Sequence, residues 1–311
     1  MQVWKKAALC GFATFVFLAI ACSEKPLAGQ SGFDLSRTTQ LAANDSWPEI
    51  NLNVVVLDKH GTPQKVDAAG FQLSEDGAKR PFGLRESAES PISIGFIVDI
   101  SGSMHNSLGP IVTVVNGVVK GLPEGSEVMV VAFNETAFLD LPFTPVSKAD
   151  LSFLWVLPTR SVTTLYDSTI EAEKYFAAHA HYLRRALVLI GDGGDNASRS
   201  GLADAIRSLQ RPGAPTFYSY FVPNDFVESR HNKRAMELLA MGGGGVVFTA
   251  PKDKNYAPTA ARLADMIRSQ YVLSFTAADP ASDGNAHKLD VRLPTKDLQV
   301  MTLPIYYAPG K

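Results

Sequence analysis

Two short segments that are dense in β-branched or aliphatic residues, at 92–98 and 186–190, constrain the fold of this chain most strongly. Neither run alternates apolar with polar residues, so each predicts a strand that is covered on both faces. Further strands are expected near 128–133, 216–221 and 245–249, separated by stretches with helical spacing. Strands that alternate with helices predict an α/β fold with a doubly wound, mostly parallel sheet.

The remaining expected elements follow from hydrophobic spacing and turn residues. Helices are expected at 108–122, 165–180, 201–209, 233–241 and 258–269, a hairpin at 134–143, and flanking strands at 52–57, 71–77, 271–276, 287–293 and 298–305. Leu289, Val291 and Leu293 alternate with charged residues, which is typical of a half-buried antiparallel strand. We therefore predict that the N- and C-terminal strands form one small β-sandwich around the inserted α/β domain.

The segment that follows the first aliphatic run places a carboxylate and two hydroxyls at alternate positions, Asp99, Ser101 and Ser103. A tight loop can bring such oxygens around one small cation. Oxygen ligands suit Mg²⁺, and the lack of thiolate or imidazole argues against zinc or copper. The triplet alone is not decisive, because short Asp and Ser motifs also open turns and cap helices.

Two other segments place oxygen ligands at the ends of predicted elements. Thr163 and Thr164 precede a helical stretch, and Asp192 follows the second aliphatic run. The carboxyl ends of parallel strands meet at one edge of a sheet, and ligands of doubly wound folds bind there. These segments and the first triplet are therefore expected to form one site.

With these motifs the chain resembles von Willebrand factor type A (VWA) domains that carry a metal-ion-dependent adhesion site, and more narrowly the bacterial, acidobacterial-type VWFA-related proteins. The resemblance covers residues 50–308 and implies a Rossmann-like VWA domain. Its motif residues are Asp99, Ser101 and Ser103 in the first loop, Thr163 in the second and Asp192 in the third. The resemblance implies that the hydroxyls bind Mg²⁺ (Mn²⁺ or Ca²⁺ as alternatives) directly, that the aspartates orient water, and that a partner's Asp or Glu carboxylate completes the coordination.

The chain departs from the family pattern at two places. Gly191 stands where such domains usually carry Ser or Thr, and Ser161-Val162 stands where they usually carry Gly-Gly. Both departures shape loops around the ion. His105, Thr164 and Asp195 are secondary candidates; the alternatives are a surface or capping role for His105 and an N-cap of the following helix for Asp195 and Asn196.

The N-terminal residues predict export. Lys5 and Lys6 precede a short apolar run, so 1–21 is interpreted as a signal peptide. Its end resembles a bacterial lipobox, which implies lipidation of Cys22 and an outer-membrane lipoprotein facing the periplasm; cleavage for simple secretion is the alternative. Residues 22–48 are expected to be a tether. Cys10 is the only other cysteine, so no disulfide is expected in the mature chain.

We divide the mature chain after this tether into an N-terminal β segment at 49–90, a VWA domain at 91–270 and a C-terminal β segment at 271–311. A net charge of −2 without a basic stripe argues against nucleic acid, and the glycines at 242–245 lack the Lys-Ser/Thr of a nucleotide-binding P-loop. The expected function is metal-dependent protein binding. A scaffold with a stabilising ion and a metal-assisted hydrolase are the alternatives, and the lack of an evident nucleophile–base pair favours a non-enzyme.

Overall fold

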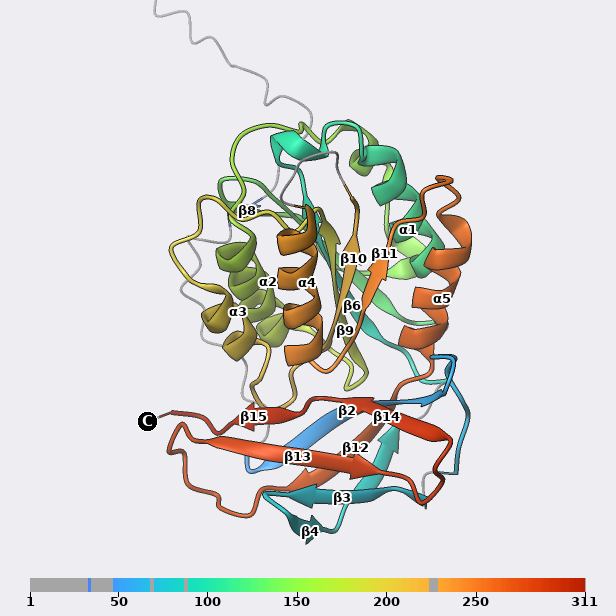
Figure 1. Cartoon of the computed structure of the whole chain (residues 1–311), viewed down its shortest axis with the longest axis vertical. Coiled ribbons are helices and arrows are strands. Elements are labelled where there is room, and N and C mark those ends of the chain that lie inside the picture. The colour runs from blue at the N-terminus through green and yellow to red at the C-terminus, as the bar shows by residue number, and fades with distance from the viewer. Residues whose placement is uncertain (1–32, 35–46, 68–69, 87–88, 224–228, 311) are drawn as a thin grey trace, which may run out of the picture.

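An α/β layer stacks on a β-sandwich in this protein (Figure 1). The structure is a computed structural model that describes residues 33–34, 47–67, 70–86, 89–223 and 229–310. The predicted signal peptide at 1–21, Cys22 and most of the predicted tether lie outside the described residues. Within the described part of the chain, no helix is long and apolar enough to cross a membrane.

A seven-stranded sheet forms the centre of the α/β layer. Its strands, in spatial order, are β1 (Phe33–Asp34), β8 (Ala137–Pro145), β7 (Glu127–Phe133), β6 (Ser93–Asp99), β9 (Arg185–Gly191), β10 (Thr216–Phe221) and β11 (Val247–Thr249). The strands from β7 to β11 run parallel, while β8 and β1 continue the sheet antiparallel. β1 belongs to the predicted tether, of which the structure also describes residues 47–48, and it pairs Phe33 with Leu139.

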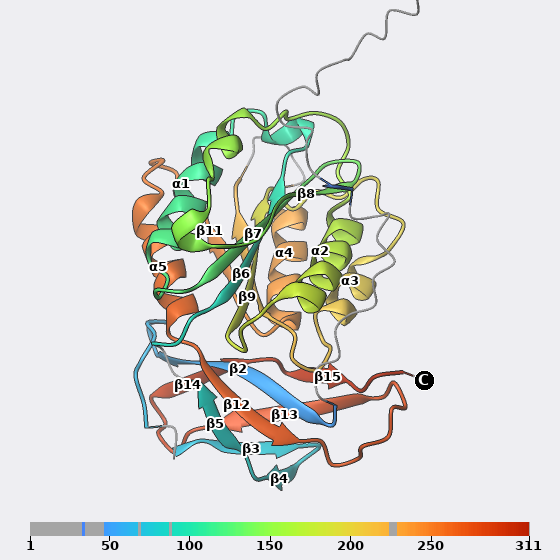
Figure 2. The same cartoon turned by 180° about the vertical axis from the view of Figure 1, so that it is seen from behind.

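Five helices cover the two faces of this sheet (Figures 1 and 2). They are α1 (Leu108–Lys120), α2 (Leu165–His179), α3 (Leu202–Ser208), α4 (Ser229–Gly242) and α5 (Ala257–Arg268). α1 and α5 contribute to one hydrophobic core, which contains Val98 of β6. α2, α3 and α4 contribute to the second core, which contains Ile97. Neighbouring residues of β6 thus enter opposite cores, which explains why the strand does not alternate apolar with polar residues from Phe96 to Val98.

The sandwich consists of two four-stranded antiparallel sheets. The strands of the first sheet are, in spatial order, β14 (Leu298–Thr302), β2 (Glu49–Asp58), β12 (Tyr271–Thr276) and β5 (Gly83–Glu86). Those of the second sheet are β15 (Ile305–Tyr307), β13 (Ala286–Arg292), β3 (Gln72–Glu75) and β4 (Ala78–Arg80). Leu52 and Leu273 from the first sheet share a core with Leu73 and Val291 from the second. β2 lies between two C-terminal strands, so both ends of the chain build one sheet. This arrangement confirms the predicted fold class.

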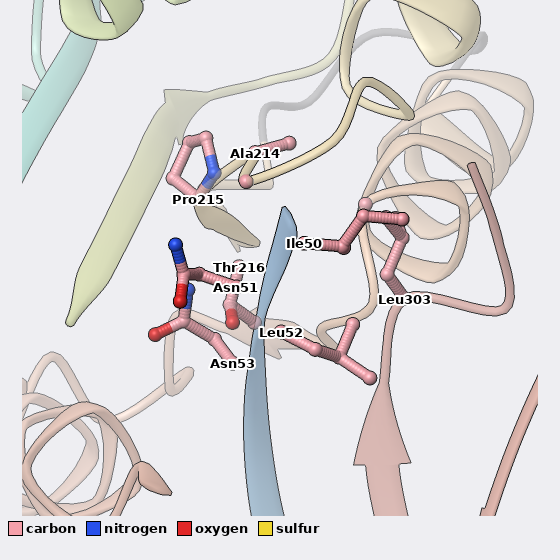
Figure 3. Close-up of a pocket in the computed structure, with 10 residues that line it drawn as sticks. Ile50, Asn51, Leu52, Asn53, Ala214, Pro215, Thr216 and Leu303 are labelled. Carbon is pink, nitrogen blue, oxygen red and sulfur yellow. The ribbon is translucent and has the colours of Figure 1, made fainter. Parts of the chain in front are cut away.

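The junction between the layers is closely packed. The N–H of Tyr307 donates to the carbonyl of Gln210 at 2.7 Å, and buried Arg184 donates to the carbonyls of Ser90 and Arg268. A small pocket lies between β2 and the start of β10, with Asn51 and other residues around it (Figure 3). Because Ser90 and Arg184 precede β6 and β9, the amino ends of the parallel strands face the sandwich. Their carboxyl ends therefore face away from it.

Candidate functional site

Asp99 is the last residue of β6, at the edge of the sheet that faces away from the sandwich. It is fully buried. Its Oδ1 accepts a hydrogen bond from the backbone N–H of Ser101 at 2.8 Å, whereas its Oδ2 has no hydrogen-bond partner. A buried carboxylate oxygen without a partner is costly, so this atom indicates that a positive group belongs beside it.

The two serines of the first loop lie next to each other. The turn after β6 continues as a short 3-10 helix, Gly102–Met104, which folds Ser103 back toward Ser101. Their Oγ atoms are 3.1 Å apart. Ser101 is buried and Ser103 is exposed. The pair therefore presents two hydroxyl oxygens between the buried carboxylate and the solvent, as the spacing predicted.

Asp192 follows the neighbouring strand β9 and lies beside Asp99. It is buried, and its Oδ1 accepts a hydrogen bond from the N–H of Gly194 at 2.9 Å. Burial, and next the charge of Asp192, raise the pKa of Asp99 to about 7 despite its hydrogen bonds to Ser101. Two adjacent buried carboxylates disfavour each other's charged form. A cation between them would remove this conflict.

Gly191 permits the close approach of these two strand ends. A Cβ at this position would lie 2.8 Å from the Cβ of Asp99 and 3.0 Å from its Oδ2. A serine or threonine, the residues usual in VWA domains, would need a shift of the Asp99 side chain. This departure from the family pattern thus has a physical reason in the present arrangement of Asp99.

The two threonines of the second loop differ in their hydrogen bonds. The hydroxyl of Thr164 donates to the carbonyl of Asn134 at 2.8 Å and lies 3.0 Å from the hydroxyl of Ser168 in α2. Thr163 is held through its backbone: its N–H donates to Asn196 Oδ1 at 2.9 Å, and its carbonyl accepts from the N–H of Asn196. The hydroxyl of Thr164 is thus used within the fold, which favours Thr163 as the ligand of this loop.

Asp195 and Asn196 of the third loop have a positioning role that the sequence did not predict. Asn196 binds Thr163 as described, and Asp195 accepts hydrogen bonds from Ser198 and from the N–H of Tyr166 in the first turn of α2. The prediction that Asp195 and Asn196 cap the following helix is wrong, because Gly201 is the N-cap of α3. Both residues instead connect their loop to the second loop, a contact between distant segments that has no local sequence signal.

The segment before Thr163 crosses the first loop. The N–H of Gly102 donates to the carbonyl of Ser161 at 3.2 Å, and Nδ1 of His105 lies 3.0 Å from the hydroxyl of Thr159. His105 is therefore placed at the exposed rim. Ser161 has a φ of +70°, a conformation that favours glycine, and its hydroxyl donates to Glu135 at 2.6 Å. This hydrogen bond holds serine where the family usually has glycine.

The assembled donors fit a hard divalent cation. Hydroxyls of Ser101, Ser103 and Thr163 and the two aspartates belong to three loops joined by hydrogen bonds. Among the described residues, no group of three or more His, Cys, Asp or Glu could hold a metal. A metal at this edge would therefore depend on neutral hydroxyls, which suit Mg²⁺ better than softer ions. The unpartnered Oδ2 of Asp99 supports this assignment.

Comparisons with known proteins find likenesses among solved structures. No protein-family model and no curated protein matches the chain. A von Willebrand factor type A protein from Catenulispora acidiphila is 12% identical, with 86% of this chain and 75% of that chain covered and a TM-score of 0.49. The conserved hypothetical protein BatB from Bacteroides thetaiotaomicron is 18% identical, covering 57% of this chain and 100% of that chain (TM-score 0.45). Proximal thread matrix protein 1 from the mussel byssus, with a zinc-occupied MIDAS motif, is 15% identical, covering 61% and 49% (TM-score 0.48).

Proposed function

We propose that this protein is an exported, metal-dependent protein-binding module. Ser101, Ser103 and Thr163 would hold a divalent cation, preferably Mg²⁺, through their hydroxyls, with Asp99 and Asp192 beside them. A partner protein would contribute an Asp or Glu carboxylate to the same ion. The N-terminal lipobox-like sequence supports an anchored position at the outer membrane, facing the periplasm. This function requires no chemical step, and the protein is proposed to be a non-enzyme.

The buried Oδ2 of Asp99 carries this proposal. It lacks a hydrogen-bond partner while Asp192 lies next to it, so two buried carboxyl groups meet at this strand edge. The proposed direct ligands are neutral hydroxyls, and the aspartates would act partly through water. A divalent cation held there would therefore keep much of its positive charge and attract a carboxylate from outside. Ser103 is exposed, so an approaching partner can reach the edge of the site from the solvent.

Metal-linked stability tests the site. We expect Mg²⁺, added after treatment with chelator, to raise the midpoint of thermal unfolding, because a ligand that binds only the folded state stabilises it. Ser103→Ala should reduce this rise, and Asp99→Asn should abolish it. Asn106→Ala serves as the matched control, since Asn106 is an exposed residue of the same loop outside the proposed ligand set.

Asp99→Asn has a second expected effect. Because burial raises the pKa of Asp99, the neutral amide should not lower the midpoint measured in chelator at neutral pH. Loss of the metal response without loss of folding would then locate the site. If neither Mg²⁺, Mn²⁺ nor Ca²⁺ moves the midpoint of the wild-type protein, these loops are not an ion site. A metal response without metal-dependent carboxylate binding would support a stabilised scaffold instead.

A further inference from the structure

Large apolar side chains are exposed in one segment that leads to the candidate site. Five large hydrophobic residues of the described chain are exposed, and three of them lie between 155 and 162. The exposed fractions of Trp155, Val156 and Val162 are 58%, 56% and 43%. Exposed tryptophan is uncommon on a surface that meets only water, and it is enriched where proteins bind partners.

This segment is built into the same edge of the sheet as the proposed ligands. The N–H of Arg160 donates to the carbonyl of Ile100 at 3.0 Å, directly after Asp99. Further contacts, from Gly102 to Ser161 and from His105 to Thr159, join the segment to the first loop. It then ends at Thr163. Val162 thus directly precedes the proposed ligand Thr163, and Trp155 and Val156 belong to the 3-10 helix that leads into the same segment.

The exposure of Trp155 follows from how its neighbours pack. Trp155 belongs to the short 3-10 helix Ser152–Val156, and the flanking Leu154 and Leu157 are buried in the core that contains α1. Burial of these leucines fixes the backbone and directs Trp155 and Val156 outward. A backbone held in this way needs no further ordering on binding, which favours affinity.

Charged residues of both signs lie around this apolar surface. Arg160 is exposed within the same segment, and Arg199 is exposed in the third loop. The nearby Glu135 accepts the hydroxyl of Ser161. A cation at the proposed site would supply positive charge there, in addition to the two arginines. With such an ion bound, the complementary ligand would carry a carboxylate beside an apolar side chain.

We propose that the residues Trp155, Val156 and Val162 form a docking strip for an acidic peptide segment of a partner protein, in which an aromatic or large aliphatic residue adjoins the metal-bound carboxylate. This inference rests on the proposed function, because the carboxylate of the same segment reaches the ion. The apolar neighbour gives the interaction its selectivity. Charge alone would accept any acidic segment, whereas the strip favours those that bury an apolar side chain on Trp155.

Bead-displayed synthetic peptides test the strip. One peptide carries Phe-Asp in a Gly/Ser background, and three others replace this pair by Ser-Asp, Phe-Asn or a run of glutamates. With Mg²⁺ present, we expect the full-length protein to bind Phe-Asp about tenfold more tightly than Ser-Asp, and Phe-Asn not at all. Trp155→Ala should reduce the preference for Phe-Asp over Ser-Asp to near one.

Met241→Ala is the matched control, because Met241 is 58% exposed like Trp155 but lies near the C-terminal end of α4, toward the sandwich. It should keep the preference. If the wild-type protein binds Phe-Asp and Ser-Asp equally, the docking strip is contradicted while the metal site is not. Binding of polyglutamate as tightly as Phe-Asp would contradict the strip in the same way. Binding of neither acidic peptide also contradicts it. The rise of the unfolding midpoint with Mg²⁺, measured on Trp155→Ala, tests the ion site independently of peptide binding.

Discussion

Asp99 and Asp140 are two buried carboxyl groups whose pKa is raised to about 7, yet their surroundings differ. Asp99 lies beside Asp192 and the hydroxyls of the candidate site. Asp140 lies in β8, where burial raises its pKa against the effect of a hydrogen bond from the backbone of Ala132, and its Oδ2 has no hydrogen-bond partner. Only Asp99 has neighbours that could share a cation. Asp140 is therefore expected to act on stability alone.

We expect Asp140→Asn to stabilise the protein at alkaline pH. The folded pKa lies above the ordinary value of an aspartate, so folding favours the protonated form, and wild-type stability should fall as the pH rises from about 4 through about 7. Asparagine does not ionise, so Asp140→Asn should not lose stability as the pH rises. The free energy of unfolding should increase by about 2 kcal/mol at about pH 8 and change little near pH 4.

Urea unfolding at several pH values measures this difference. Asp297→Asn is the control, because Asp297 is exposed in the turn before β14 and its substitution should leave the pH dependence unchanged. Parallel pH profiles for Asp140→Asn and the wild-type protein would show that Asp140 does not titrate differently in the folded state.

Single residues were predictable from sequence where the chemistry is local. The spacing of Asp99, Ser101 and Ser103 after an aliphatic run, together with the motifs at Thr163 and Asp192, predicted that the three lie together at a strand end, and the structure places them there. The structure further favours Thr163 over Thr164, because the hydroxyl of Thr164 binds Asn134. The roles of Asn134 and Asn196 could not be predicted, since each acts on a loop about 30 residues away.

Among the elements, helices and parallel strands followed the predicted spacing, while the sandwich strands did not follow it fully. Residues 298–305 form two strands in different sheets, β14 and β15, where one was expected. β5 was not predicted. It is a strand of four residues that pairs with β12 through a register shift, so its structure depends on a distant partner and its own pattern is weak.

α1 and α5 pack closely because α1 carries glycine where the helices meet. A Cβ on Gly117 would lie 2.8 Å from the Cβ of Ala260, and one on Gly121 would lie 2.8 Å from that of Ala264. Alanine normally stabilises a helix relative to glycine. Here we expect Gly117→Ala to lower the free energy of unfolding by about 1–3 kcal/mol, because the added methyl group overpacks the contact.

A second substitution separates this contact from helix propensity. In the Ala260→Gly background the opposing methyl group is absent, so Gly117→Ala should become stabilising by up to about 1 kcal/mol. Chemical denaturation of the four proteins in this cycle gives the coupling energy. Equal effects of Gly117→Ala in both backgrounds would show that α1 and α5 do not meet through these two residues.

At the scale of the whole molecule, the sandwich lies at the end of the α/β layer that is opposite the candidate site. Strands from both flanks share one sheet, and Val55 and Leu57 of β2 also contribute to the core that contains α1 and α5. Sequence pattern predicted the sandwich. It could not predict how the layers contact each other, because this contact depends on loops such as the one around Leu303.

Gly244 lies where the α/β layer contacts the sandwich, so a substitution there tests how firmly the two layers are joined. It has a φ of +75° after α4, and a Cβ there would lie 2.5 Å from the backbone nitrogen of Leu303 in the sandwich. Gly61 has the same φ of +75° with nothing within 4 Å. Gly61→Ala should therefore cost only the backbone strain, about 1–2 kcal/mol, whereas Gly244→Ala should cost at least about 1 kcal/mol more because the layers must shift apart. If Gly61→Ala and Gly244→Ala lose the same unfolding free energy, the two layers can separate at this point without cost. A second thermal transition in Gly244→Ala alone would show that the cooperative unfolding of the two layers depends on this contact.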